Sequence, residues 1–185
     1  MARPKKHVQP TVNVSLRIDP KVKFAIELLA REQKRTITGA IEWAVQKALS
    51  SQQVTTGADV GNLQMLVDRV WSPDDLERVL YLGIFTEHLL SFEEQCLWLV
   101  VRDNPHFLEV QERDAAGRIA SFVLRKARID FCRDLIEKRA GELRDGGRLR
   151  PISLDEIKEA GGSALEMAES LNVRISPEKW ERGFD

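Results

Sequence analysis

Hydrophobic and polar residues alternate near the N-terminus, in the stretch VNVSLRIDP at residues 12–20. A period of two predicts a β-strand, and Asp19-Pro20 marks its end. No convincing partner strand lies next to it in the chain, so the backbone groups along both of its edges would be unpaired. The first question that the sequence raises is therefore what this strand pairs with.

Two helical patterns follow the strand. Asp19 can cap a helix and Pro20 suits its first position. The segment KVKFAIELLAREQKR, residues 21–35, then has a broad apolar side, made of Val22, Phe24, Ala25, Ile26, Leu28 and Leu29. A second segment, TITGAIEWAVQKAL, starts with Thr36 as a cap and repeats apolar side chains at helical spacing, at Ile37, Ile41, Ala44 and Ala48. Residues 11–50 are thus predicted to form a strand followed by two helices.

The rest of the chain is predicted to be helical. Residues 51–62 are polar, contain glycine and lack a period, which predicts a linker. Helix-start signals then predict helices near 63–70, 73–90 and 92–103, and a long pattern predicts another over about 113–145. We expect a helical domain over 63–150 and a weakly structured helical tail over 151–185, where Gly161-Gly162 interrupts two cap-like sites. The predicted fold class is mainly α, with an all-helical C-terminal domain.

The composition indicates the class of protein, and the charged residues are unevenly distributed along the chain. With 185 residues and 43% hydrophobic residues the chain can bury a core, and no stretch has the apolar length of a membrane span or a secretory signal, so we expect a soluble, cytoplasmic protein. Cys96 and Cys132 lie in apolar patterns and are expected in the core. Residues 1–50 contain ten Lys and Arg against four Asp and Glu, residues 51–112 three against eleven, and residues 113–150 eleven against six.

Dimerisation answers the question of the lone strand. Two copies that align their strands antiparallel would satisfy each other's edges in a two-stranded ribbon, and the apolar helix faces would merge beneath it. The expected dimer core then comprises Val12, Val14, Leu16, Ile18, Ile26, Leu29 and Ile41.

The same alternation sends Asn13, Ser15 and Arg17 to the opposite face of the ribbon. A two-stranded ribbon fits the major groove of DNA, where Arg can bind guanine and Asn can bind adenine through two hydrogen bonds, while Ser adapts to either. These three residues are therefore the predicted base contacts.

The stretch NVSLRIDPKVKFAIELLAREQKRTITGAIEWAVQKAL resembles the ribbon-helix-helix DNA-binding domain of the Arc and MetJ type. The resemblance covers residues 11 to about 50 and rests on the alternating polar triplet, on the proline at the strand-to-helix junction and on the RTIT start of the second helix. It implies an intertwined dimer that contacts bases through Asn13, Ser15 and Arg17. It also implies a DNA phosphate at Thr36, Ile37 and Thr38, and helix N-termini bind anions on physical grounds too.

Two further features of this region leave alternatives open. Gly39 departs from the expected first turn of the second helix, where it either permits close approach of a phosphate or weakens the helix. The basic arm of residues 1–10, with Lys5 and Lys6 beside Arg3 and His7, is either a set of phosphate contacts or a solvated terminus.

Other chemistry has little support. The three histidines show no metal-protease spacing, and no glycine-rich phosphate loop or nucleophile elbow occurs, so we expect no enzyme, no metal and no cofactor. The basic stretch 113–150 is either a second nucleic-acid surface, or, as we favour, an ion-paired helix or a complement to the acidic residues 51–112.

The sequence thus predicts a repressor that binds a palindromic or repeated operator in double-stranded DNA as a homodimer, with a tetramer on DNA as a further option. The alternatives are an antitoxin that neutralises a partner protein and regulates its own operon, and an accessory protein for plasmid partition or transfer origins on a mobile element. A protein partner would bind through the C-terminal domain, and no membrane partner is expected.

Overall fold

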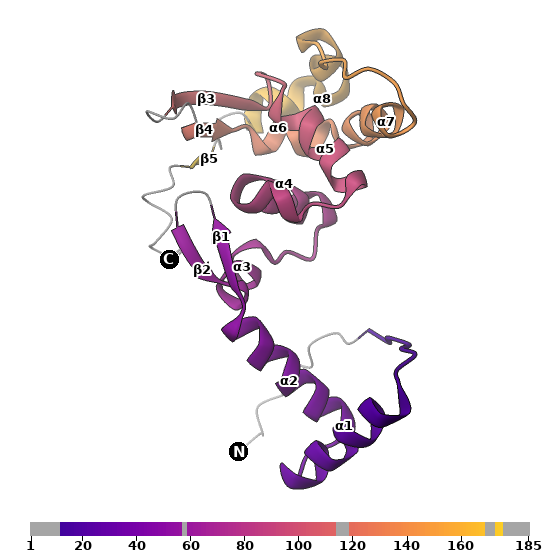
Figure 1. Ribbon diagram of the computed structural model, residues 1–185. Coiled ribbons are helices and arrows are strands. Elements are labelled where there is room, and N and C mark those ends of the chain that lie inside the picture. The colour runs from indigo at the N-terminus through magenta and orange to yellow at the C-terminus, as the bar shows by residue number, and fades with distance from the viewer. Residues whose placement is uncertain (1–11, 57–58, 114–118, 169–172, 176–185) are drawn as a thin grey trace, which may run out of the picture. The chain divides into compact units, whose positions relative to one another are not determined.

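The computed structural model describes residues 12–56, 59–113, 119–168 and 173–175, and the chain forms two compact units (Figure 1). Unit 1 comprises Met1–Gln53 and Asn62–Gln64, and unit 2 comprises Val54–Gly61 and Met65–Asp185. The elements are mainly helical, as the sequence predicts. Each unit is described by itself.

Unit 1 contains the two helices expected from the sequence. Helix α1 spans Pro20–Glu32, and its cap is the side chain of Asp19, which accepts a hydrogen bond from the Lys21 amide at 2.8 Å. Helix α2 spans Ile37–Ser51 after the predicted cap Thr36. The short polar side chains accept from amides that the first helical turn leaves unpaired, which fixes both starts. Both predicted starts are confirmed.

The turn between the two helices depends on a left-handed residue. Lys34 has φ 53°, the one positive φ of a residue other than glycine in the described part of the chain. Its amide donates to the Arg31 carbonyl at 3.1 Å, and the Arg35 amide donates to the Ala30 carbonyl at 2.9 Å. These bonds satisfy the last carbonyls of α1 and reverse the chain into α2.

The segment predicted as a linker forms a β-hairpin instead. Strand β1 spans Gln53–Thr56 and strand β2 spans Asp59–Asn62, and the two pair with each other. The Leu63 amide donates to the Gln52 carbonyl at 2.8 Å and closes the base of the hairpin. The sequence VTTGADV contains a β-branched run on one side of a Gly-Ala pair, which is a hairpin signal that its polarity obscures.

The first helices of unit 2 follow the predicted pattern. They are α3 (Leu63–Val70), α4 (Asp75–Thr86) with the short η1 (Glu87–Leu89), and α5 (Phe92–Arg102). Helix α4 is capped by Asp74, whose side chain accepts from the Glu77 amide at 2.9 Å. Helix α5 begins with the capping box that the sequence predicts, because Ser91 and Glu94 accept from each other's amides.

The expected long helix over 113–145 is wrong up to residue 124. Residues 108–113 and 119–124 form an antiparallel pair, β3 (Leu108–Arg113) and β4 (Ile119–Leu124), and β5 (Val173–Ile175) pairs with the other edge of β4. The C-terminal domain is therefore not all-helical. The segment IASFVL is rich in β-formers, and buried residues at Phe122 and Leu124 fit a period of two as well as a helix, so spacing alone misassigns it.

Three helices complete unit 2: α6 (Lys126–Phe131), α7 (Arg133–Arg144) and α8 (Leu154–Ala168). The end of the long pattern at Gly146-Gly147 is confirmed, since α7 ends just before this pair and Gly146 has φ 88°. Helix α8 continues through Gly161-Gly162, where the sequence predicted an interruption. Ser153 and Glu156 form a capping box at its start, with the Ser153 amide 2.9 Å from a Glu156 carboxylate oxygen.

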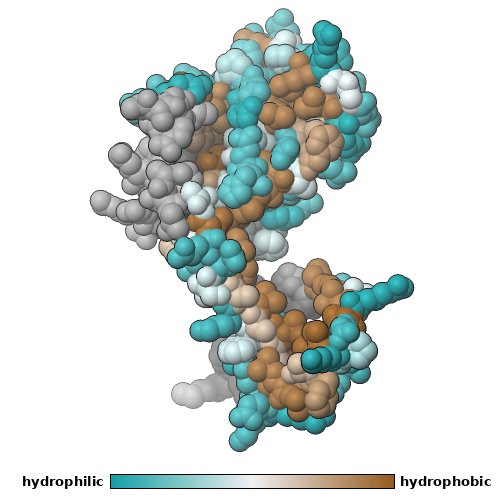
Figure 2. Space-filling model, in the orientation of Figure 1, coloured by the Kyte–Doolittle hydropathy of each residue, from teal (hydrophilic) through white to brown (hydrophobic). Residues whose placement is uncertain are grey.

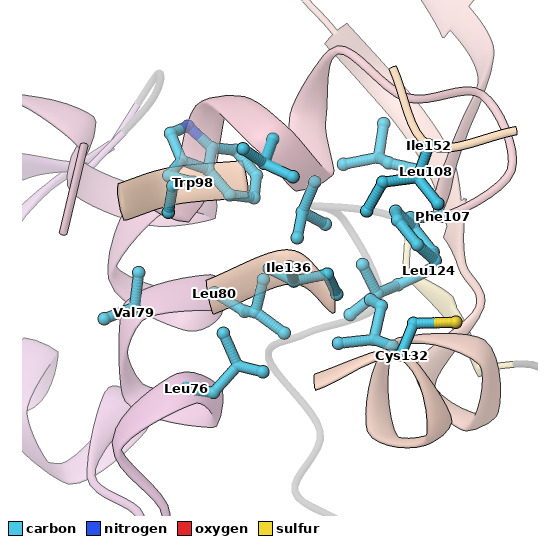
Figure 3. Packing of buried hydrophobic residues seen from close by; sticks show 14 of the residues in the cluster. Leu76, Val79, Leu80, Trp98, Phe107, Leu108, Leu124, Cys132, Ile136 and Ile152 are labelled. Carbon is cyan, nitrogen blue, oxygen red and sulfur yellow. The ribbon is translucent and has the colours of Figure 1, made fainter. Parts of the chain in front are cut away.

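An apolar core joins helices α4 to α8 and strands β3 and β4 of unit 2. Figure 3 shows Leu76, Val79 and Leu80 of α4 on one side of it and Phe107, Leu108, Leu124 and Ile152 on the other. Both cysteines lie in this core as predicted, and burial raises the pKa of the Cys96 and Cys132 thiols. Asn104 is fully buried and donates from Nδ2 to the Ile152 carbonyl at 3.0 Å. Unit 2 is therefore a domain with its own core.

Candidate nucleic-acid interface

Residues 12–18, the predicted strand, form neither helix nor strand in the single chain. The predicted base contacts Asn13, Ser15 and Arg17 are all exposed. The apolar residues between them are exposed too, at 86% for Val12, 72% for Val14, 64% for Leu16 and 45% for Ile18. Within the described residues the segment thus has no strand partner, and its apolar row is uncovered.

The apolar faces of both helices in unit 1 are also largely uncovered. Only Ala30 and Ala40 are buried among its described hydrophobic residues. Ile26, Leu29 and Ile41, the helical part of the predicted dimer core, are half-buried. Hydrophobic atoms appear on the visible surface of α1 and α2 in Figure 2, and the exposed large side chains there are Val22, Phe24, Leu28, Ile37 and Val45. Two buried alanines are too small a core to hold a fifty-residue unit together.

At the start of α2, the predicted phosphate site, some hydrogen-bond donors are used to cap the helix and others are free. Thr36 Oγ1 accepts from the Gly39 amide at 3.1 Å, and the Thr36 carbonyl accepts from the Ala40 amide at 2.9 Å. The amides of Ile37 and Thr38 and the Thr38 hydroxyl have no partner among the described residues. Thr36 therefore caps the helix, while Ile37 and Thr38 supply the free donors.

The structure does not decide why Gly39 occupies this position. A Cβ atom at position 39 would lie 3.2 Å from Thr36 Oγ1, a close contact that a shift of a few tenths of an ångström would relieve. Glu94 and Glu156 occupy the equivalent positions of α5 and α8 beside intact serine caps, so the cap alone does not require glycine.

Lys5 and Lys6, with the rest of the basic arm, lie outside the described residues. No protein-family model, curated protein or solved structure matches the sequence. The resemblance of residues 11–50 to the ribbon-helix-helix family therefore remains a prediction that rests on the residues alone.

The second basic stretch, residues 113–150, is largely engaged with acidic residues. Arg125 pairs with Glu109 at 2.6 Å, Lys126 with Glu77 at 3.3 Å, and Arg133 with Asp74. These partners belong to the acidic stretch 51–112, so the interpretation of mutual charge compensation within unit 2 is supported. Among the expected neighbours on the same helix, Lys126 and Asp130 pair at 3.5 Å.

The carboxylates in these pairs are held in their charged form. The amide of Glu77 and the Arg133 guanidinium lower the pKa of Asp74, although burial opposes them. A hydrogen bond from the Ser72 hydroxyl, aided by Lys126, lowers the pKa of Glu77. The basic surface of this stretch is therefore neutralised where it meets α4.

Unit 2 also has an open cavity of about 640 Å³ between α4, α5 and α7. Its lining includes Leu76 and Leu97 and several acidic residues, and Arg133 and Arg78 in the lining are already paired to Asp74 and Asp75. Within the described ranges no group of three or more His, Cys, Asp or Glu is placed to hold a metal, and no helix is long and apolar enough to cross a membrane.

Proposed function

We propose that the chain is a homodimeric, sequence-specific DNA-binding protein, acting as a transcriptional repressor through unit 1. The observation that carries the proposal is the exposed stretch 12–18, in which an uncovered apolar row alternates with three uncovered polar side chains. A second copy covers the apolar row, and DNA is the partner of the polar row.

Pairing with a second copy is favoured over another partner strand by symmetry and register. When two identical strands pair antiparallel, polar residues must lie opposite polar residues and apolar residues opposite apolar ones. A register shifted by one residue would put apolar side chains on the polar face. A two-fold axis beside Ser15 meets this condition and places Asn13 of one copy opposite Arg17 of the other. The two strands then present six polar side chains on one face, over a core built from the exposed residues of α1 and α2.

The free donors at the start of α2 support the same function. Backbone amides at a helix N-terminus bind phosphate, and no acidic residue lies in the first turn of α2 to compete with it. Contacts to phosphate would set the position of the dimer on the duplex, whereas contacts of the ribbon to base edges would select the sequence.

Replacing Arg17 with Ala tests base recognition. We expect the preference for a selected operator over random DNA to fall by about 1–3 kcal/mol for each Arg17 side chain, because its bidentate hydrogen bonds to guanine are removed. Competition binding with both duplexes measures this preference.

Arg17→Lys is the matched control, because it keeps the charge but removes the planar fork of the guanidinium. It should retain affinity for random DNA and still lose operator preference. Equal weakening on operator and random DNA in the Ala variant would contradict base recognition by Arg17.

A further inference from the structure

The turn between α1 and α2 contains three cations without a carboxylate partner. Arg31, Lys34 and Arg35, called the turn cations below, are exposed, and none forms an ion pair among the described residues. Glu32, in the same turn, forms none either. The turn therefore carries a net charge of +2 that no ion pair among the described residues neutralises.

Many of the described cations in unit 2 contact a carboxylate. Those that do include Arg78, Arg102, Arg125, Lys126, Arg133, Arg139, Arg144 and Arg150. In unit 1, Lys23 pairs with Glu27 at 3.5 Å. Lys47 in unit 1 and Lys138, Arg148 and Lys158 in unit 2 also lack an ion pair among the described residues, so the distinctive feature of the turn is that three such cations lie within five residues.

Two of the turn cations occupy positions where a cation does not help the fold. Lys34 has φ 53°, a conformation that glycine adopts at lower cost. Arg35 precedes the cap of α2, at the positive end of the helix dipole, where a positive charge is unfavourable. Arg31 lies in the last turn of α1, where the dipole does favour a cation. An external anion would offset the electrostatic cost at Arg35.

We propose that the turn cations bind the phosphate backbone of DNA and supply a sequence-independent part of its affinity. This inference rests on the proposed function and adds to it a second set of phosphate-binding groups, distinct from the ribbon and from the free amides of Ile37 and Thr38. The dimer contains two such turns, so two clusters would hold the duplex backbone while the ribbon contacts base edges.

The salt dependence of binding to a random-sequence duplex tests this inference in the full-length chain. We expect Lys34→Gln with Arg35→Gln to flatten the decline of log affinity with log salt, by about 0.9 for each phosphate that the protein no longer neutralises. If one cation of each turn binds a phosphate, two phosphates per dimer are released, and the affinity change between 50 and 200 mM salt becomes roughly tenfold smaller. Operator preference should not change, since binding to phosphate carries no sequence information.

Lys47→Gln is the matched control, because Lys47 is an exposed cation on α2 that also lacks an ion pair among the described residues. It should keep the wild-type slope. Lys34→Gly guards against misfolding, because glycine suits the left-handed turn and removes only the side chain. Combined with Arg35→Gln, it should reduce the slope as Lys34→Gln with Arg35→Gln does.

The outcomes separate the two proposals. If the wild-type protein binds the duplex and the turn variants keep its slope of log affinity against log salt, the role of the turn cations is overturned. The proposed function is then left intact. Wild-type protein that fails to bind any duplex would overturn both. A slope that falls equally in Lys47→Gln would also overturn the role of the turn cations, because any surface cation would then act alike.

Discussion

Leu16→Asp is expected to convert the chain from a dimer to a monomer. In the proposed ribbon Leu16 lies in the apolar row that the second copy covers, and each dimer would bury two such side chains. Each copy loses about 2 kcal/mol of apolar burial, and each buried carboxylate adds several kcal/mol of desolvation. The dissociation constant of the dimer should rise by more than about 1,000-fold. Sedimentation equilibrium measures the change.

Asn13→Asp provides the control for this prediction. It places the same charge on the opposite face of the ribbon, across from Arg17 of the other copy, so the dimer should persist. DNA binding should nevertheless fail, because the new carboxylates face the phosphates of the groove. If Leu16→Asp sediments as the same dimer as the wild type, the ribbon is not the dimer interface.

Phe107→Ala is expected to destabilise unit 2 by about 3–5 kcal/mol. The Phe107 side chain is fully buried between β-strand and helical residues of the core (Figure 3), so its removal leaves a cavity that rigid neighbours fill only in part. Urea denaturation followed by circular dichroism measures the loss. Phe131→Ala removes the same side chain from a position that is 41% exposed, and it should cost clearly less, about 1–2 kcal/mol. Equal costs at the two positions would contradict the placement of the core.

The starts of α1, α2 and α5 were predictable because the signals are local. Asp19, Thr36 and Ser91 are short polar residues directly before apolar periodic segments, and each accepts a hydrogen bond from an amide of the helix that follows. Such bonds depend on neighbours three residues away at most, so the sequence alone specifies them.

The β-structure of unit 2 was not predictable from spacing. Residues 119–124 pair with 108–113 and with the distant segment 173–175, and burial of Phe122 and Leu124 follows from those contacts. Over six residues a helical period and a strand period select nearly the same apolar positions, so only the tertiary partners decide between them. The hairpin at 53–62 was missed for a related reason, since its polar residues resemble a loop.

The candidate interface was predicted in part. The sequence singled out Asn13, Ser15 and Arg17 from alternation, and the structure leaves them exposed beside an uncovered apolar row. The sequence did not distinguish the roles of Thr36 and Thr38. Thr36 caps α2, whereas the Thr38 hydroxyl has no partner among the described residues, and only the hydrogen bonds show this difference. The turn cations were missed as a group, although the letters REQKR already contain them, because their lack of carboxylate partners appears only in the fold.

Selection of bound sequences from random DNA by the full-length chain tests the central claim most directly. A dimeric ribbon with two-fold symmetry should enrich a short sequence together with its inverted repeat, at a fixed spacing between the two halves. Bound pools without any enriched sequence would contradict base recognition by Asn13, Ser15 and Arg17.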